Sequence, residues 1–337
     1  MIMAKPAHLE PSKLGTKEYW DALYTTEITN HAHDPLDTGT AWFDDSDAET
    51  KLLEFLDEPE RAQELGLDTA TTSFLDLGTG NGALLFALRD AGWVGPMLGV
   101  DYSAQSVRFA RRIERARRRE GKERGGGDGS KKGDAEEEGD TAKNNEGKAD
   151  EHEEDDDEED DDEEDDDDDD EDEDVHFAEH DIFHTPATAL LHARFSPSIV
   201  EGWDVILDKG TFDAISLSAE TLDGADNADD TNTPPATDDT GTRPRRINEA
   251  YGTRILPLIR EGGLFLITSC NWTETELRSW FEGDGTLQET PAASEDQEPV
   301  YWGFKIVGRV EYRSFSFGGV KGQTISSLCF QKVRKSR

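Results

Sequence analysis

The chain has 337 residues and a formal net charge of −42, because 77 Asp and Glu residues outnumber 35 Lys and Arg residues. Its two cysteines, Cys270 and Cys329, are too few for a disulfide framework and lack the spacing of a zinc site, which excludes a disulfide-stapled secreted domain. No apolar run resembles a signal peptide, and none is long enough to span a bilayer. We therefore expect a soluble protein of the cytoplasm, with the nucleus as a second compartment and no membrane partner.

The negative charge is concentrated in one segment. Residues 122–174 contain 32 Asp and Glu residues against 6 Lys and Arg residues, and like charges at this density repel one another. The almost purely acidic run that ends this segment offers no side chain to bury, so nothing offsets the entropy lost on ordering. The sequence predicts a flexible tail over residues 1–12 and a single domain over 13–337. A disordered acidic insert at 122–174 and a flexible loop at 219–246 interrupt that domain.

Outside these segments, short apolar runs alternate with helical patterns, which is typical of βα units around a parallel sheet. Strands are predicted at SFLDLG (73–78), MLGVDYS (97–103), VHFAEHDI (175–182), WDVILDKG (203–210), GLFLITSC (263–270), FKIVGRVEYRSFSF (304–317) and TISSLCFQKV (324–333). The turn-rich GGVKGQ between the final two predicts an antiparallel hairpin. The fold class is α/β: a Rossmann-like, seven-stranded, mostly parallel sheet with an antiparallel C-terminal hairpin and helices on both faces.

Three helices can be placed from their boundary residues. One opens at residue 82 and ends at Gly92. A second, basic helix covers 104–119, and Ser103 can cap its first turn. A third precedes the fifth strand and is predicted to stop at Gly262–Gly263.

The glycine-rich turn after the first strand, DLGTGNG, suggests a cofactor with an adenosine group. Gly78, Gly80 and Ala83 fit the dinucleotide fingerprint, whereas Gly78, Gly80 and Gly82 with Asp76 fit the looser loop that holds S-adenosylmethionine. A dinucleotide brings an anionic pyrophosphate, which Asp76 would repel. S-adenosylmethionine brings an ammonium and a sulfonium, which Asp76 would attract. The loop therefore favours S-adenosylmethionine, and a nicotinamide oxidoreductase remains an alternative.

Carboxylates end the next three strands as well. Asp101 is placed to accept both ribose hydroxyls. Asp181 could accept from an adenine amino group, with Ile182 beside the ring. Asp208 ends the fourth strand, where the transferred methyl group is expected.

These residues resemble the class I, seven-strand methyltransferases, and more closely the eukaryotic lysine methyltransferases that modify translation elongation factor 1-alpha. The resemblance rests on LGTKEYWDALY (14–24), DTGTAWFDDSDAE (37–49), FLDLGTGNG (74–82), VDYS (100–103), DKGTFDAISLS (208–218), LITSCNWTETEL (266–277) and FSFGGVKGQT (315–324). It implies S-adenosylmethionine-dependent N-methylation of a lysine on elongation factor 1-alpha. The cofactor contacts that it implies are Trp20, Gly78, Asp101 with Tyr102, and Asp181 with Ile182.

Methyl transfer to lysine requires a neutral amine held in line with the methyl group. Lysine arrives protonated, and a dry aromatic pocket with a nearby carboxylate favours loss of the proton. We predict Asp208 as this catalytic carboxylate. The aromatic walls are predicted to be Trp20, Tyr24, Trp42 and Phe212. The resemblance alone adds Asn271 and Trp272 to a substrate channel.

Alternative functions remain open at this point. A small-molecule methyltransferase would share the cofactor loop, and a non-catalytic protein could use its acidic tract to bind basic partners. His176, His180 and His184 recur every four residues, but a strand spreads them apart, so no metal site is predicted. We expect a monomer that binds a protein substrate and no nucleic acid directly.

Overall fold

The computed structural model describes residues 6–125, 174–192, 197–222, 245–283, 287–290, 299–313, 315–317, 320–322 and 324–335. Most of the predicted acidic insert (122–174) and of the predicted flexible loop (219–246) lies outside these residues. The described part of the insert is short: residues 122–125 end a helix and Asp174 precedes a strand. Thr221 and Arg246 pair across the base of the loop.

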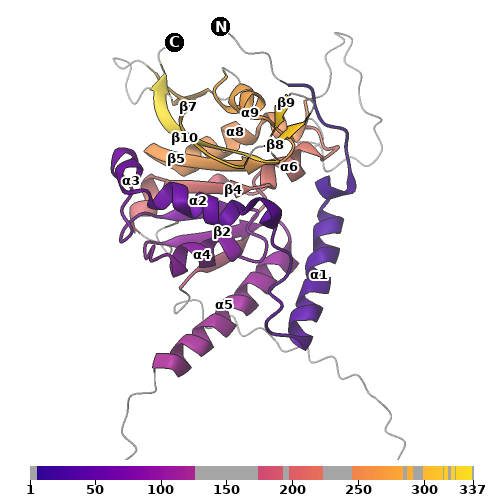
Figure 1. Ribbon diagram of the computed structural model, residues 1–337. Helices are drawn as coiled ribbons and strands as arrows, with labels where there is room; N and C mark the ends of the chain where they lie inside the picture. Colours follow the sequence, from indigo (N-terminus) through magenta and orange to yellow (C-terminus); the bar gives the residue numbers. More distant parts are fainter. Residues whose placement is uncertain are drawn as a thin grey trace, which may run out of the picture.

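An eight-stranded sheet forms the centre of the molecule (Figure 1). Its order is β3-β2-β1-β4-β5-β10-β7-β6. The strands are β1 (Phe74–Leu77), β2 (Met97–Asp101), β3 (His176–Glu179), β4 (Trp203–Lys209), β5 (Ile259–Ser269), β6 (Gln288–Thr290), β7 (Val300–Val310) and β10 (Ser326–Lys335). β1 to β5 pair in parallel, whereas β10, β7 and β6 join the sheet through antiparallel pairs. The predicted mostly parallel sheet with an antiparallel C-terminal pair is confirmed, and β6 adds a short edge strand.

The boundaries of β5 differ from the prediction. The sequence suggests a helix that stops at Gly262–Gly263, but β5 already begins at Ile259. Gly262 has φ +76°, and the pairing with β4 shifts register here, from Trp203 opposite Ile259 to Val205 opposite Leu264. The two glycines therefore form an irregularity inside the strand, and the helix they were expected to end stops at Ile255.

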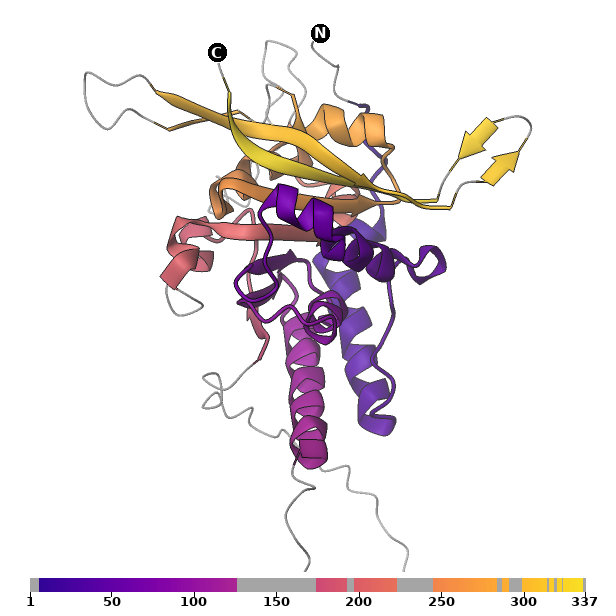
Figure 2. The ribbon, with the colours of Figure 1, turned by 60° about the vertical axis from the view of Figure 1, so that its left-hand side comes forward.

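The C-terminal pair is also less simple than a hairpin with one turn. β7 ends at Val310, and the residues after it form a separate two-stranded sheet of β8 (Phe315–Phe317) and β9 (Val320–Gly322). Figure 2 shows this small sheet projecting from the end of the β7–β10 pair.

Helices cover both faces of the sheet, as predicted. One face carries α1 (Lys17–His33), α2 (Ala48–Asp57), α4 (Ala83–Asp90) and α5 (Ala104–Gly125), with α3 (Pro59–Leu65) next to α2. The other carries α6 (Thr211–Ser216), α8 (Tyr251–Ile255) and α9 (Glu274–Phe281), with short 3-10 turns. β5 shows how the two cores divide: Leu264 and Leu266 join the first, whereas Phe265 and Ile267 join the second.

The predicted helix boundaries near the glycine loop hold. Gly92, at φ +91°, follows the end of α4 and donates its N–H to the Arg89 carbonyl. Ser103 accepts a hydrogen bond from the Ser106 N–H through its hydroxyl (3.3 Å), which caps α5. α5 lies beside α1 and extends beyond the sheet (Figure 2).

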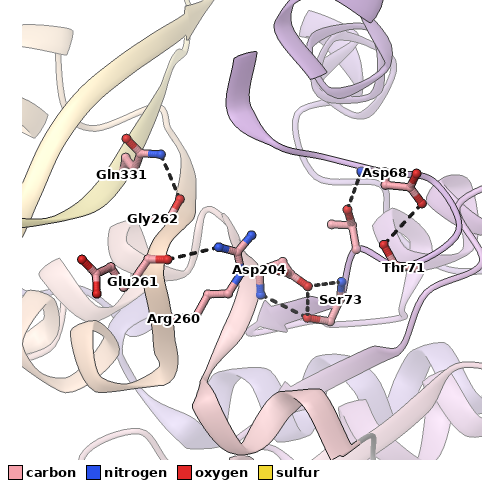
Figure 3. Close-up of polar contacts among 9 residues, drawn as sticks. Asp68, Thr71, Ser73, Asp204, Arg260, Glu261, Gly262 and Gln331 are labelled. Atoms are coloured by element: carbon pink, nitrogen blue, oxygen red, sulfur yellow. Dashed lines mark hydrogen bonds and ion pairs between the residues drawn. The ribbon is translucent and has the colours of Figure 1, made fainter. Parts of the chain in front are cut away.

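Polar side chains connect β1, β4 and β5 where these strands begin (Figure 3). Asp204 accepts from the Ser73 N–H (2.8 Å) and hydroxyl (2.7 Å) and forms an ion pair with Arg260. These contacts satisfy polar groups at the amino ends of the strands, on the edge opposite the carboxyl ends.

Residues 6–12, for which the sequence suggests a flexible tail, lie against the domain. Ser12 donates its N–H to the Leu217 carbonyl at 3.0 Å, and His8 lies 3.2 Å from a Glu249 carboxylate oxygen. The Arg246 guanidinium donates to the carbonyls of Leu9 and Ser216. The N-terminal segment is thereby brought over α6.

Candidate functional site

A cavity of about 320 Å³ opens at the carboxyl ends of the five parallel strands. This is the edge at which α/β proteins bind ligands. Its lining from the strand ends comprises residues 76–81, 100–102, 180–184, 209–211, 213–215, 217, 218, 220, 270 and 271. The remaining wall comes from residues 14, 15, 17, 20, 24, 42 and 43, together with Ile247 and Tyr251.

The glycine loop forms the floor of the cavity. Gly78, Gly80 and Gly82 all have φ between +61° and +79°, which L side chains rarely adopt. A Cβ at Gly78 would lie 2.2 Å from Thr211 Oγ1, and one at Gly80 would lie 2.6 Å from the Tyr24 hydroxyl oxygen. Gly78 and Gly80 line the cavity, whereas Gly82 turns the chain into α4 against Phe177.

Asp101 joins the glycine loop to α5. Its carboxylate accepts from the Gly80 N–H (3.2 Å) and the Ser103 N–H (2.9 Å), and burial raises its pKa. Neighbouring Tyr102 is half-buried, and the Lys17 Nζ lies 5.8 Å from the centre of its ring. Both residues line the cavity, so Asp101 is held where a ribose could be bound, as the sequence suggests.

Asp76 is a buried carboxylate that faces the cavity. Burial raises its pKa to about 7, and Lys209 only partly opposes this effect. Lys209 is itself held by Glu49, with 3.2 Å between the Lys209 Nζ and the carboxylate oxygen, and by the Trp42 carbonyl, also at 3.2 Å. A cation entering the cavity would therefore find Asp76 without a dedicated positive partner among the described residues.

Asp181 and Ile182 lie at the end of β3, and both line the cavity. The Asp181 carboxylate accepts from the Phe183 N–H at 2.8 Å and lies 2.9 Å from His184 Nδ1, which fixes its orientation. The preceding residue, His180, is 5% exposed and its Nε2 has no hydrogen-bond partner, while burial lowers its pKa. His180 also lines the cavity and had no predicted role in binding.

Three of the four predicted aromatic walls lie at the cavity: Trp20, Tyr24 and Trp42. Trp20 donates its indole N–H to the Leu14 carbonyl at 2.9 Å and contacts Trp42 with ring centres 5.3 Å apart. Tyr24 is 7% exposed and stacks on Trp20. The α1 helix thus supplies an aromatic side to a cavity that is otherwise built from strand ends.

The structure does not bring Asp208, the predicted catalytic carboxylate, to the cavity wall. β4 turns into α6 at Gly210, so the first N–H groups of this helix point at Asp208. Its carboxylate accepts from the Thr211 N–H (2.8 Å), the Phe212 N–H (3.1 Å) and the Tyr251 hydroxyl (2.8 Å). Burial raises the pKa of Asp208 to about 8.

Phe212, the fourth predicted wall, also lies behind the cavity. It is 1% exposed and stacks on Tyr251 with ring centres 5.5 Å apart. Of the two residues added by the resemblance, Asn271 lines the cavity. Trp272 is buried and donates its indole N–H to the Ser216 hydroxyl at 3.2 Å.

Several cavity residues were given no binding role from the sequence. They are Lys17, His180, Lys209, Asp213, Glu220 and Tyr251. Asp213 could have been suspected as a cavity residue, because it lies in the short helix that begins at Thr211, directly after the end of β4. Tyr251 and Lys17 are distant in sequence from every strand end, and only the folded chain brings them there.

The charge of the lining is unbalanced. Five carboxylates face the cavity, those of Asp76, Asp101, Asp181, Asp213 and Glu220, against two lysines. Both lysines form ion pairs with other acids, Lys17 with Asp21 at 3.0 Å and Lys209 with Glu49. The site therefore favours a cationic ligand and disfavours the pyrophosphate of a dinucleotide.

Comparison with known proteins identifies the family. Residues 68–123 match a methyltransferase domain model. The chain is 31% identical to the protein-lysine N-methyltransferase EFM4 of Saccharomyces cerevisiae over 98% of its own length and 99% of that protein. It is also 26% identical to the EEF1A lysine methyltransferase 2 of Danio rerio, over 98% of its own length and 92% of that protein. The chain belongs to this family of protein-lysine N-methyltransferases.

The methyl donor of this methyltransferase is S-adenosylmethionine, and the cavity fits it. At Gly78 and Gly80 the positive φ and the close approach of Thr211 and Tyr24 admit only glycine, so the backbone of the loop itself lines the cavity. Asp101 and Asp76 offer acceptors for the ribose and the ammonium, and the unpaired Nε2 of His180 offers a further polar contact.

Two other features of the described residues bear on the predictions. No group of three or more His, Cys, Asp or Glu residues in the described part could hold a metal ion. Across the same residues, no helix has both the length and the apolar character needed to cross a membrane.

Proposed function

We propose that this protein methylates the side-chain amine of a lysine in translation elongation factor 1-alpha. The relatives from fish and mammals carry the name EEF1A lysine methyltransferase 2, and the similarity extends over almost the whole chain. The observation that carries the proposal is the cavity itself, because its surplus of carboxylates suits two cations, the methyl donor and a lysine side chain.

The residues of this protein have two tasks in the reaction. S-adenosylmethionine supplies a methyl group that its sulfonium activates. Asp101 and the glycine loop orient the donor, and Trp20, Tyr24 and Trp42 exclude water from the reacting end. The lysine ammonium must lose a proton to solvent before its lone pair forms the new nitrogen–carbon bond, as the carbon–sulfur bond breaks and sulfur keeps the electron pair.

A methylation assay on purified elongation factor 1-alpha tests the proposal. We expect deuterated methyl groups from labelled S-adenosylmethionine on a lysine, detected by mass spectrometry of the digested factor. Asp101→Ala serves as the inactive control, because its carboxylate accepts a hydrogen bond from the glycine loop and lines the cavity. Labelled metabolites from an extract, with an unlabelled elongation factor, would instead support a small-molecule methyltransferase.

We further propose that the enzyme is a monomer located mainly in the cytoplasm, with the nucleus as its second compartment. An abundant translation factor as the substrate supports the cytoplasmic location. Light scattering on the purified protein and microscopy of a fluorescent fusion measure the two properties directly. A stable dimer, or exclusion from the cytoplasm, would contradict them.

A further inference from the structure

The cavity has two distinct ends on either side of the glycine loop. One end contains Asp101 and Ile182, which suit the adenosine of the donor. The opposite end is built by the residues after β4 and β5, including Asp213, Cys270 and Asn271. If the donor lies with its adenosine toward Asp101, the lysine must reach it from this second end, which we call the acceptor end.

Asp213 is the buried carboxylate of the acceptor end. It lies in α6 and is 5% exposed. One carboxylate oxygen accepts from the Ser269 hydroxyl and the other accepts from the Cys270 N–H at 2.8 Å. Both donors belong to the chain at the end of β5, so the carboxylate is fixed on the cavity wall by two neighbouring segments.

No described lysine or arginine forms an ion pair with Asp213. Burial without a cationic partner raises its pKa, since an ionised carboxylate is costly in a poorly hydrated site. The donors that reach the carboxylate are the Ser269 hydroxyl, the Cys270 N–H and thiol, and the Asn271 N–H, and none of them carries a charge. An ammonium group at the acceptor end would supply the missing charge.

Asp208 is the other acidic candidate on this side, and its contacts point to a different role. Its oxygens are occupied by two helix N–H groups and the Tyr251 hydroxyl, and it does not line the cavity. Asp208 therefore fixes the start of α6, and α6 in turn carries Asp213 into the cavity.

We propose that Asp213 binds the side-chain ammonium of the target lysine and holds the nitrogen in place as its proton leaves to solvent. The inference rests on the function proposed above. It makes Asp213 a catalytic residue that touches the substrate, and it assigns no proton acceptor other than water.

Steady-state kinetics of Asp213→Asn in the full-length chain test this role. We expect kcat/KM for elongation factor 1-alpha to fall about 100-fold, because a charge-assisted hydrogen bond to the substrate is lost. The affinity for S-adenosylmethionine should stay within about twofold, as measured by calorimetry, since the donor end is unchanged. Thermal unfolding of the variant checks that it remains folded.

Asp45→Asn is the matched control. Asp45 is exposed and outside the cavity lining, yet near the acceptor end: burial and Asp213 mainly raise the pKa of Cys270, and the charge of Asp45 adds to their effect. Asp45→Asn removes the same negative charge but leaves the proposed contact between Asp213 and the lysine ammonium intact. We therefore expect its kcat/KM to stay within about twofold of that of the unsubstituted enzyme. An equal fall in both variants would indicate a general charge effect and overturn the specific role of Asp213.

A binding measurement makes the result independent of the protein substrate. Butylammonium, a mimic of the lysine side chain, should shift the amide resonances of Ser269 and Cys270 in the S-adenosylhomocysteine complex, whereas butanol should not. Equal shifts with both probes, or unchanged kinetics in Asp213→Asn, would overturn the proposal. If the original enzyme leaves elongation factor 1-alpha unmethylated, the proposed substrate fails, and the butylammonium titration still decides the role of Asp213.

Discussion

Asp76 illustrates how burial prepares a single residue for a cationic ligand. The carboxylate is 3% exposed, and burial raises its pKa to about 7, so near neutral pH it is partly protonated in the free protein. A cation bound beside it favours the ionised form and lowers that pKa. Binding of the donor is therefore coupled to release of a proton.

We expect this release to be measurable at pH 6, where most of the free protein carries the proton on Asp76. Calorimetry of S-adenosylmethionine binding in two buffers with different ionisation enthalpies gives the number of protons released. The number should fall toward pH 8, because Asp76 is then ionised before binding. Asp76→Asn should release fewer protons at pH 6, and an unchanged number would assign the release to another group.

The raised pKa of Asp76 also affects stability, with a definite sign. Its folded-state pKa of about 7 exceeds the ordinary value of 3.8, so the folded protein binds more protons than the unfolded chain between about pH 4 and pH 7. The contribution of this group to the free energy of unfolding is present below pH 4 and is lost as the pH rises through about 7. Donor binding compensates for this loss by pairing the charge.

At the scale of secondary-structure elements, the glycine loop depends on the space between β1 and α6. Thr211 begins α6 and donates its hydroxyl to the Leu77 carbonyl at 2.6 Å. A Cβ at Gly78 would lie 2.2 Å from the oxygen of that hydroxyl. The start of α6 and the end of β1 therefore leave room for a glycine only.

Gly78→Ala and Gly66→Ala separate this collision from backbone strain. Both glycines have positive φ, +65° and +70°, but nothing lies within 4 Å of a Cβ at Gly66. We expect each substitution to cost about 1 kcal/mol of stability from strain. Gly78→Ala should in addition lose donor affinity by roughly tenfold or more, as measured by calorimetry. Equal donor affinities in the two variants would refute the steric argument.

The sequence predicted the parallel strands and their ligand-binding edge because these features are local. Apolar runs mark β1 and β4, and polar residues directly after them mark the cavity. Asp101, Gly78 and Gly80, which the sequence predicts as cofactor contacts, all line the cavity. The irregularity at Gly262 was not predicted, because two consecutive glycines can either terminate a helix or bend a strand.

The acceptor side could not be resolved from sequence. Asp208 and Asp213 both follow β4, and only the start of α6 decides which carboxylate caps the helix and which enters the cavity. The fit of Tyr251 against Asp208 depends on packing between distant segments. The position of a residue after a strand predicts the edge of the sheet at which it lies. Whether its side chain enters the cavity depends on the direction set by the local turn.

For the whole molecule, the two described ends of the acidic insert, the end of α5 and Asp174, lie away from the edge of the sheet that carries the cavity. α5 leads away from the cavity, and Asp174 resumes the described chain just before β3 begins. Arg89 holds Asp174 through its carboxylate at 3.1 Å and its carbonyl at 2.6 Å. The return point of the insert is thus fixed far from the glycine loop.

Replacing residues 126–173 by a short Gly-Ser linker should leave donor affinity within about twofold. Turnover on elongation factor 1-alpha, measured at low and high salt, reveals whether the acidic charge recruits the protein substrate. A loss of turnover at low salt alone would indicate recruitment, and equal rates at both salt concentrations would indicate a solvated insertion without a catalytic role. Loss of donor affinity would contradict the separation of the insert's two ends from the cavity.

The position of β10 between β5 and β7 has a consequence for biosynthesis. β7 precedes β10 in the chain, so it leaves the ribosome before the strand that connects it to β5 has been made. Until residues 326–335 emerge, the nascent polypeptide carries an open strand edge of the kind that invites aggregation and chaperone binding. The β5 wall of the cavity is therefore completed late in translation, the process whose elongation factor we propose as the substrate.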